Sequence, residues 1–272
     1  MKYSNSTFAF ILVLLFLIYS GNAFAESCED ERWNKILSNI GKVSNDELSN
    51  EWMIAKNKCE VESFFEFRHA LIYIYSSDFD KANLIIDEAL SSKLRDYRFV
   101  YLAKAQMYYA KWLKTRDDDL KHNMFDAYKE IITRYPEWYV GYERLGNAKY
   151  SFGEYSEAIE LLEKSINKGG SYASKVVLVA TYYQMSNYEK AISFVPEIIK
   201  NHPPARVEKT FMLSAAWSFF EANRFMDGQK VLLVLMEENP NIKNDPDFIN
   251  AVGYLKTKIE EMENNNEAKN EK

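Results

Sequence analysis

The chain has 272 residues, a formal net charge of −6 and a pI of about 5.4. Hydrophobic residues make up 47% of it, which is enough for a sizeable buried core. An acidic balance without a basic stripe argues against nucleic acid as a partner. It also argues against docking to an anionic membrane surface.

Residues 1–25 are predicted to be a secretory signal peptide. Lys2 precedes an apolar run over residues 8–19, and Ala23-Phe24-Ala25 supplies small residues where a signal peptidase reads. An uncleaved membrane anchor is the alternative, although about twelve apolar residues are short for a span of about twenty. We expect no membrane-spanning segment after cleavage.

The mature protein is expected to be exported. A lipid anchor is disfavoured because Glu26 stands two residues before Cys28, where a lipobox needs a small uncharged residue. The Lys-, Asn- and Ile-rich composition, and the lack of an Asn-x-Ser/Thr acceptor after the signal, favour a bacterial periplasm over a eukaryotic secretory route.

Residues 26–62 are predicted to form a helical hairpin. Its two amphipathic faces carry, respectively, Trp33, Ile36, Leu37 and Ile40, and Leu48, Trp52, Ala55 and Cys59. An antiparallel pairing would bring together Cys28 and Cys59, the only two cysteines. In an oxidising compartment we expect a disulfide, which would stabilise the fold by about 3–4 kcal/mol. Two buried thiols are the alternative.

Small residues recur at intervals of about 33 residues over the next part of the chain. The first series is Ala70, Ala103, Gly146, Val179 (the exception), Ala216 and Gly253, and the second is Ala82, Met124, Ala158, Ala191 and Gly228. Small residues at fixed places let two neighbouring helices approach closely, so the pattern predicts one helical hairpin for each repeat. Hairpins of this kind bury their apolar faces by stacking into a solenoid.

Segment 139–172 carries the pattern best. Eight residues stand where tetratricopeptide repeats (TPRs) place their signature side chains: Tyr142, Leu145, Gly146, Tyr150, Gly153, Tyr155, Ala158 and Leu162. This segment strongly resembles the TPR family, and residues 78–82 and 187–192 resemble second helices of further copies. The resemblance implies an all-α, right-handed superhelix over residues 63–262.

The resemblance implies about five repeats and a capping helix. The apolar stripe of that helix is Phe248, Val252, Leu255, Ile259 and Met262. The tail, residues 263–272, lacks apolar anchors and is expected to be disordered. In the second repeat, Ala103 and Met124 lie further apart than the equivalent pairs, which predicts either a longer helix pair or a protruding loop near Trp112–His122.

No motif of catalysis or of metal binding is found in the sequence. His69, His122 and His202 lack partners at metal-ligand spacing, and Gly169-Gly170 lacks the context of a phosphate loop. Residues 117–119 are three aspartates without the spacing of a calcium loop. We therefore expect a non-enzymatic protein without cofactor or metal.

In TPR proteins the first helix of each repeat lines a concave groove, so the resemblance implies a set of partner-binding residues. The set is Phe67, Leu71, Ile74, Val100, Lys104, Met107, Glu143, Asn147, Tyr150, Val176, Tyr183, Leu213, Trp217 and Phe220. The same register also places Phe64, Tyr97, Val140, Ala173, Ala180 and Thr210 on this face.

This wall is aromatic and apolar, which suits an extended peptide or an amphipathic helix. The clamp with which some TPR proteins bind carboxylates is not expected, because Glu143, Ala173 and Val177 surround Asn147. The leading hypothesis is a periplasmic scaffold that helps to assemble an envelope complex. The alternatives are a transporter accessory protein that encloses a small hydrophobic molecule, and self-association through the wall. The rings could also simply pack against the next repeat.

Overall fold

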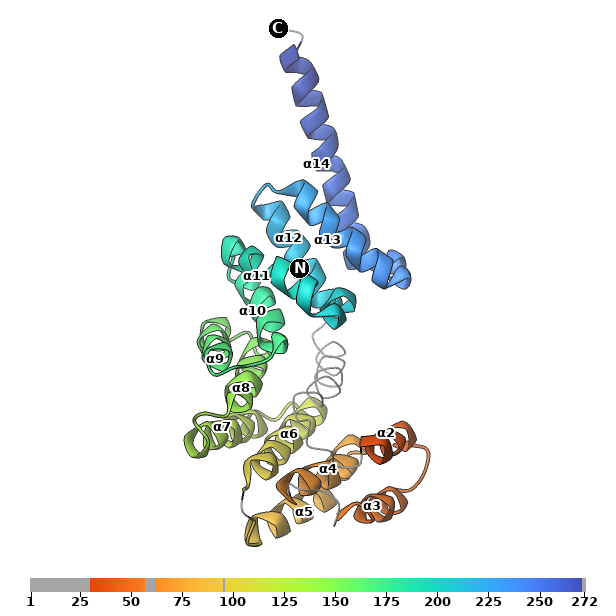
Figure 1. Ribbon diagram of the computed structural model, residues 1–272, viewed down its shortest axis with the longest axis vertical. Coiled ribbons are helices and arrows are strands. Elements are labelled where there is room, and N and C mark those ends of the chain that lie inside the picture. Colours follow the sequence, from red (N-terminus) through yellow and green to blue (C-terminus); the bar gives the residue numbers. More distant parts are fainter. Residues whose placement is uncertain (1–29, 57–61, 95, 271–272) are drawn as a thin grey trace. The chain divides into compact units, whose positions relative to one another are not determined.

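A computed structural model describes residues 30–56, 62–94 and 96–270. Within these ranges the chain is all-α, as predicted, with thirteen α-helices, two short 3-10 helices and no strand. The α-helices, labelled in Figure 1, are α2 (Asp30–Asn39), α3 (Asn45–Met53), α4 (Glu62–Tyr75), α5 (Phe79–Ser91), α6 (Arg98–Thr115), α7 (Asp118–Arg134), α8 (Tyr139–Ser151), α9 (Tyr155–Asn167), α10 (Tyr172–Gln184), α11 (Tyr188–Asn201), α12 (Lys209–Glu221), α13 (Phe225–Glu238) and α14 (Pro246–Asn270). The 3-10 helices are η3 (Pro203–Val207) and η4 (Pro240–Asn244). The expected signal peptide, residues 1–25, and the expected Cys28–Cys59 disulfide lie outside the described residues and stay predictions.

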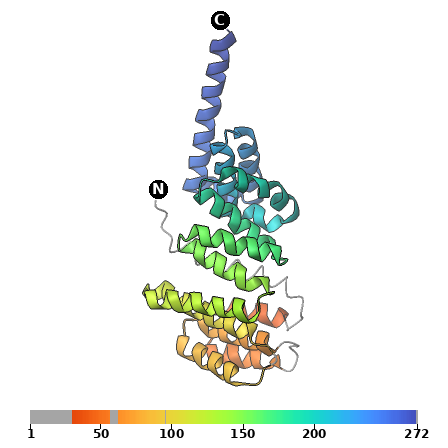
Figure 2. The same cartoon turned by 90° about the vertical axis from the view of Figure 1, so that its left-hand side faces the viewer.

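Helices α4 to α13 form five consecutive helical hairpins, and α14 follows as a single helix. The chain divides into two compact units, residues 1–145 and 146–272, with the boundary inside α8. Within the first unit, α4 packs on α5 and on α6, and α6 packs on α7. Within the second unit, α10 packs on α9, α11 and α12, and α12 packs on α13 and α14 (Figure 2).

The turns inside the five hairpins share one backbone device. Each has a residue with positive φ just after its first helix: Ser77, Arg116, Gly153, Ser186 and Asn223, with φ between 56° and 77°. The left-handed conformation of this residue lets the amide that follows it donate a hydrogen bond to a carbonyl in the last turn of the first helix. For example, the Asp78 amide donates to the Tyr73 carbonyl at 2.8 Å, which satisfies an otherwise unpaired group. The sequence indicated this position only at Gly153.

The two small-residue series mark the contacts between helices. All their members except Gly253 are buried. A Cβ atom at Gly146 would lie 2.9 Å from Leu162 Cγ, and one at Gly228 would lie 2.4 Å from Phe220 Cε1. Nothing lies within 4 Å of the equivalent point at Gly253, because no helix follows α14 in the described chain.

The N-terminal hairpin packs on α4 through aromatic side chains. The rings of Trp33 and Trp52 meet edge to face with centroids 5.4 Å apart, and Trp52 Nε1 donates to the Phe65 carbonyl at 3.1 Å. The guanidinium of Arg68 lies over both indoles, 5.3 and 5.7 Å from their centroids. Of the two predicted apolar faces, Trp33, Ile36, Leu48, Trp52 and Ala55 are buried, while Leu37 and Ile40 keep intermediate exposure.

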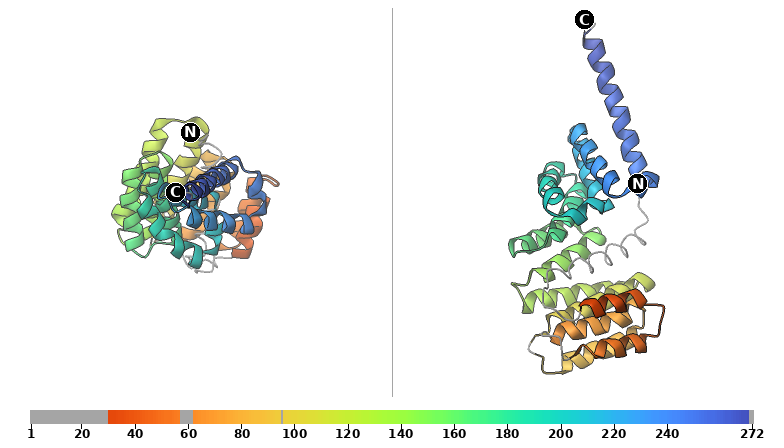
Figure 3. Two further views of the ribbon diagram at one scale, coloured as in Figure 1. Left: turned by 90° about the horizontal axis from the view of Figure 1, so that it is seen from above. Right: turned by 45° about the vertical axis from the view of Figure 1, so that its right-hand side comes forward.

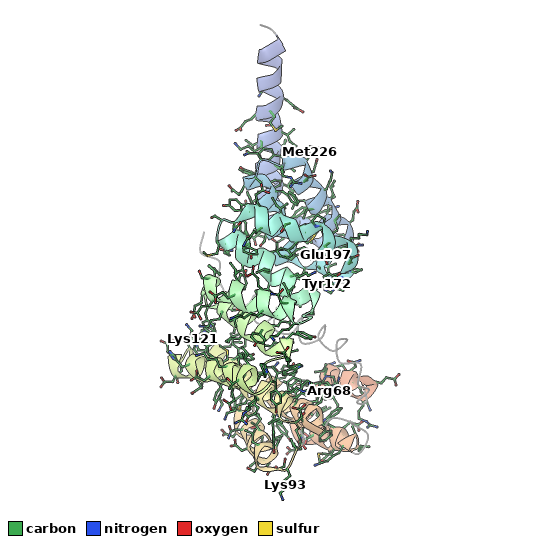
Figure 4. All side chains as sticks on the ribbon, turned by 60° about the vertical axis from the view of Figure 1, so that its left-hand side comes forward. Arg68, Lys93, Lys121, Tyr172, Glu197 and Met226 are labelled. Atoms are coloured by element: carbon green, nitrogen blue, oxygen red, sulfur yellow. The ribbon has the colours of Figure 1, made fainter. Side chains whose placement is uncertain are left out.

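The extra length in the second repeat is a longer helix pair. Helices α6 and α7 have 18 and 17 residues, and only Arg116 and Asp117 separate them. Asp117 caps α7 by accepting from the Asp119 amide at 2.9 Å, and the Arg116 guanidinium covers the Trp112 ring. The far end of this hairpin lies near Lys121 in Figure 4. Of the two alternatives left open by the sequence, the protruding loop is therefore wrong.

Helix α14 continues further than expected. Its stripe is buried at Phe248 and Leu255, while Val252 and Met262 are more than 40% exposed, and its later turns extend beyond α13 (Figure 3). The helix runs to Asn270, so the disorder expected from residue 263 is wrong for the described part of the tail. Glu, Lys and Ala are good helix formers, and a helix that is already nucleated propagates into them at little cost.

Candidate protein-binding surface

The predicted binding residues of the first unit are mostly buried. They lie on α4, α6 and the first half of α8. Six of them have exposed fractions of 7% or less: Phe67, Leu71, Ile74, Val100, Met107 and Glu143. Phe67 packs at 6.0 Å from the Phe64 ring and 6.1 Å from the Phe99 ring. Of the predicted set in this unit, only Lys104 keeps intermediate exposure.

The first unit also buries polar groups beneath this face. Glu143 and Arg144 are 2% and 8% exposed, and both lie among tyrosines. Burial raises the pKa of the Tyr128 phenol to about 12, with Arg144 opposing the shift. Burial, aided by the Glu143 charge, also raises the pKa of Tyr139. These groups form a packed interior, so they offer little surface to another molecule.

The second unit presents a different surface at the same register positions. Asn147, Tyr150, Tyr183 and Trp217 keep intermediate exposure, and they come from α8, α10 and α12. Their predicted neighbours are buried and hold the helices together: Val176, Leu213 and Phe220. The structure thus leaves the amphipathic rings of Tyr150, Tyr183 and Trp217 partly exposed and buries the purely apolar members of the set. Whether these residues bind a partner stays a prediction.

A recurring ring pair supports the accessible tyrosines. Tyr150 lies 5.8 Å from Tyr155, and Tyr183 lies 6.1 Å from Tyr188, each pair joining the end of a first helix to the start of the second. Phe220 and Phe225 form the same pair at 6.2 Å. Each of these rings therefore contacts a second ring across the turn of its own hairpin.

A third accessible ring belongs to Trp217. Its centroid is 5.6 Å from the Phe220 ring and 5.0 Å from the Tyr254 ring of α14. Tyr254 was not in the predicted set, because the last helix was assigned only a capping role. The contact joins the accessible surface of α12 to that of α14.

Sequence reasoning also missed Glu208. This residue caps α12, where Glu208 Oε2 accepts from the Phe211 amide at 3.0 Å. Burial raises the pKa of its carboxyl, and the Glu208 charge contributes in turn to the raised pKa of Tyr150. The residue as a whole keeps intermediate exposure, and burial of the carboxyl is the largest cause of its raised pKa. A capping residue lies outside the helix register, which is why the pattern did not indicate it.

The part of the chain that the structure describes contains neither a metal-binding cluster nor a membrane-spanning helix. Nowhere in residues 30–56, 62–94 and 96–270 do three His, Cys, Asp or Glu side chains gather closely enough to hold a metal ion. In the same ranges no helix combines the length and apolar character that a membrane span requires.

The fold itself is found in other proteins. The chain superposes on the C-terminal part of a TPR repeat-containing protein from Cytophaga hutchinsonii with a TM-score of 0.56 and 17% identity, covering 82% of this chain and 85% of that one. The chain has the TPR fold. A TPR protein from Parabacteroides merdae is similar over 86% of this chain and 88% of its own, with a TM-score of 0.52 and 13% identity. No protein-family model and no curated protein matches the sequence.

These similarities place each accessible side chain in the TPR frame. Asn147, Tyr150, Tyr183 and Trp217 all lie on first helices, the helices that line the groove in a TPR superhelix. The identities are below 20%, so the comparison concerns the fold, and the function has to be argued from the surface.

Proposed function

We propose that the protein is an exported, non-enzymatic TPR scaffold of the bacterial periplasm that binds a polypeptide partner on the first helices of its second unit. One observation carries the proposal: Tyr150, Tyr183 and Trp217 remain accessible where the apolar members of the same register are buried. Tyrosine and tryptophan provide large contact areas with a polar edge and few rotatable bonds, which suits protein recognition.

Assembly of an envelope complex is the role that best fits these features. A signal-like segment at residues 1–25 and an even pair of cysteines support export to an oxidising compartment. A solenoid without a catalytic motif can hold two or more chains near one another. Sequencing the N-terminus of the protein from the periplasmic fraction should give Glu26 as the first residue.

The binding proposal is tested by a photo-crosslinking residue at Tyr183 in living cells, with the adduct identified by mass spectrometry. A matched residue at Glu189, which is exposed on the second helix α11, serves as the control. We expect a polypeptide adduct at Tyr183 that does not form at Glu189. The same adduct at both positions, or a small molecule at Tyr183, would contradict the proposal; the second result would favour a transporter accessory protein.

A further inference from the structure

The last described helix, α14, has an apolar stripe that its own chain covers only in part. The stripe runs from Phe248 to Met262 in steps of four, three, four and three residues. Phe248 and Leu255 are buried, whereas Val252 and Met262 are 41% and 49% exposed, and Ile259 keeps intermediate exposure. The chain therefore uses two members of the stripe for its own packing and leaves the other three accessible.

The side of α14 next to Val252 is also open. In the complete hairpin of α8 and α9, this side of the first helix is covered by the second helix, and a Cβ atom at Gly146 would lie 2.9 Å from Leu162 Cγ. At Gly253 nothing lies within 4 Å of the equivalent point, and Ile249, one turn earlier, is 53% exposed. A helix from another molecule therefore has room to approach α14 closely.

Beyond α13, the later turns of α14 have little support from the rest of the chain (Figure 3). The side chains of residues 256–264 are described, and none of them is buried, yet the helix continues to Asn270. A helix of about fifteen residues is only marginally stable in water when it stands alone. A partner that covered Ile259 and Met262 would supply the burial that this part of the helix lacks.

The spacing of the stripe is that of a heptad, in which positions a and d form the seam of a coiled coil. In this frame Val252 and Ile259 occupy position a, and Leu255 and Met262 occupy position d. A β-branched residue at a, combined with leucine at d, favours a parallel coiled coil of two strands. The stripe thus matches a partner helix that carries the same pattern.

The charges beside the seam fit a second copy of the same helix. Lys258 occupies position g, and Glu263 occupies the next position e, five residues later. In a parallel pair of identical helices these two positions face each other across the seam, so two Lys258–Glu263 pairs would form. Within one chain, Lys258 Nζ lies 2.8 Å from Glu261 Oε2, but both groups are partly exposed, and such a pair competes only weakly.

We propose that α14 joins two copies of this protein as a short, parallel, two-stranded coiled coil that begins at Val252. Val252, Ile259 and Met262 would meet their equivalents in the second copy, while Phe248 and Leu255 stay in the core of their own chain. Because the seam is short, we expect a dissociation constant of about 10–100 µM. This association goes beyond the proposed function and uses a surface separate from the accessible rings on α8, α10 and α12.

Sedimentation equilibrium of the purified protein over about 5–500 µM tests the proposal. We expect a reversible equilibrium between monomer and dimer. Ile259→Lys and Met262→Lys together should abolish the dimer, because they would place four charges in the seam. The matched control is Met226→Lys, at a residue of α13 that is 60% exposed and lies outside the stripe, and it should leave the equilibrium unchanged (Figure 4).

Two results of this experiment would overturn the proposal. One is a monomer at every concentration of the unaltered protein. The other is a dimer that persists in the double variant. Thermal unfolding followed by circular dichroism checks that the solenoid of each variant remains folded.

Charge reversals identify the partner and the direction of pairing. Lys258→Glu and Glu263→Lys each put like charges at both contacts across the seam, so either variant alone should dimerise about tenfold more weakly. An equimolar mixture of the two should regain association, since both contacts between the variants then join opposite charges. Unchanged association of the single variants, or a mixture that does not regain it, would also overturn the proposal.

The outcome is separable from that of the crosslinking experiment. An adduct of another polypeptide at Tyr183 together with a monomeric protein would keep the scaffold and remove the dimer. A dimer with the expected response to the charge reversals, but without an adduct at Tyr183, would keep the coiled coil and remove the scaffold.

Discussion

The two units expose the same helix positions to different extents. In the first unit, predicted binding residues such as Phe67 and Met107 are buried, and Lys104 is the one that keeps intermediate exposure. In the second, Tyr150, Tyr183 and Trp217 are accessible. A TPR register therefore tells which helix face a residue occupies but does not tell whether that face is covered. Apolar side chains of this register are buried in both units, and in the first unit the charged Glu143 is buried with them.

The largest expected effect comes from truncating a ring on the buried side of this comparison. Phe67→Ala would leave a cavity beside Phe64 and Phe99, and we expect a loss of about 3–5 kcal/mol in the free energy of unfolding. The matched change Tyr183→Ala, on the accessible side, should cost about 1 kcal/mol. Urea unfolding followed by circular dichroism measures both. Similar losses in the two variants would show that the units do not differ.

The accessible tyrosines should matter for binding more than for folding. We expect Tyr150→Ala and Tyr183→Ala together to weaken binding of the crosslinked partner by about 2 kcal/mol or more, while the helical content stays nearly unchanged. Calorimetry with that partner and far-UV circular dichroism measure the two quantities. An unfolded double variant would instead show that these rings are core, as in the first unit.

Two glycines of the same series provide a second matched pair. Gly146→Leu should destabilise the protein by about 1–3 kcal/mol, because even a Cβ atom would lie 2.9 Å from Leu162 Cγ. Gly253→Leu meets open space and replaces glycine inside a helix, so it should stabilise by up to about 1 kcal/mol. Thermal unfolding compares them. Equal effects would contradict the repeat register.

Much of the fold could be predicted because it depends on local spacing. Ala82 and Ala158 are fully buried where the second small-residue series placed them, and the five hairpins follow the predicted repeats. The site could be predicted less well. Glu143, for example, is 2% exposed because neighbouring helices cover its face. The spacing of residues along one helix cannot predict whether another helix covers that face.

Residues outside the helix register were missed for the same reason. Glu208 and Arg116 lie at helix ends, where capping and a left-handed backbone conformation decide the structure. Arg116 adopts φ of 58° although its side chain is not typical of that conformation, so tertiary packing overrides local preference there. Composition patterns with a period near 3.6 carry no signal for such positions.

The smallest expected effect concerns the pH dependence of stability at two carboxylates that cap helices, Glu208 directly before α12 and Asp245 directly before α14. Burial alone would raise the pKa of Asp245, but the Lys209 hydrogen bond and charge outweigh it, so the folded pKa lies below 3.8. Its stabilisation is therefore present above pH 3.8 and is lost as the pH falls towards the folded value. For Glu208, burial raises the pKa above 4.5, so ionisation is less favourable in the folded state and stability falls as the pH rises through that range.

Neutral variants of the two carboxylates should consequently change stability in opposite directions. At pH 7, Asp245→Asn should lower the free energy of unfolding and Glu208→Gln should raise it, each by about 1 kcal/mol or less. Both differences should shrink towards pH 3.5, as the two carboxylates become protonated. Urea unfolding at the two pH values measures them. If Glu208→Gln lowered stability at pH 7, the cost of burying the Glu208 charge would already be offset by the backbone amides at the start of α12.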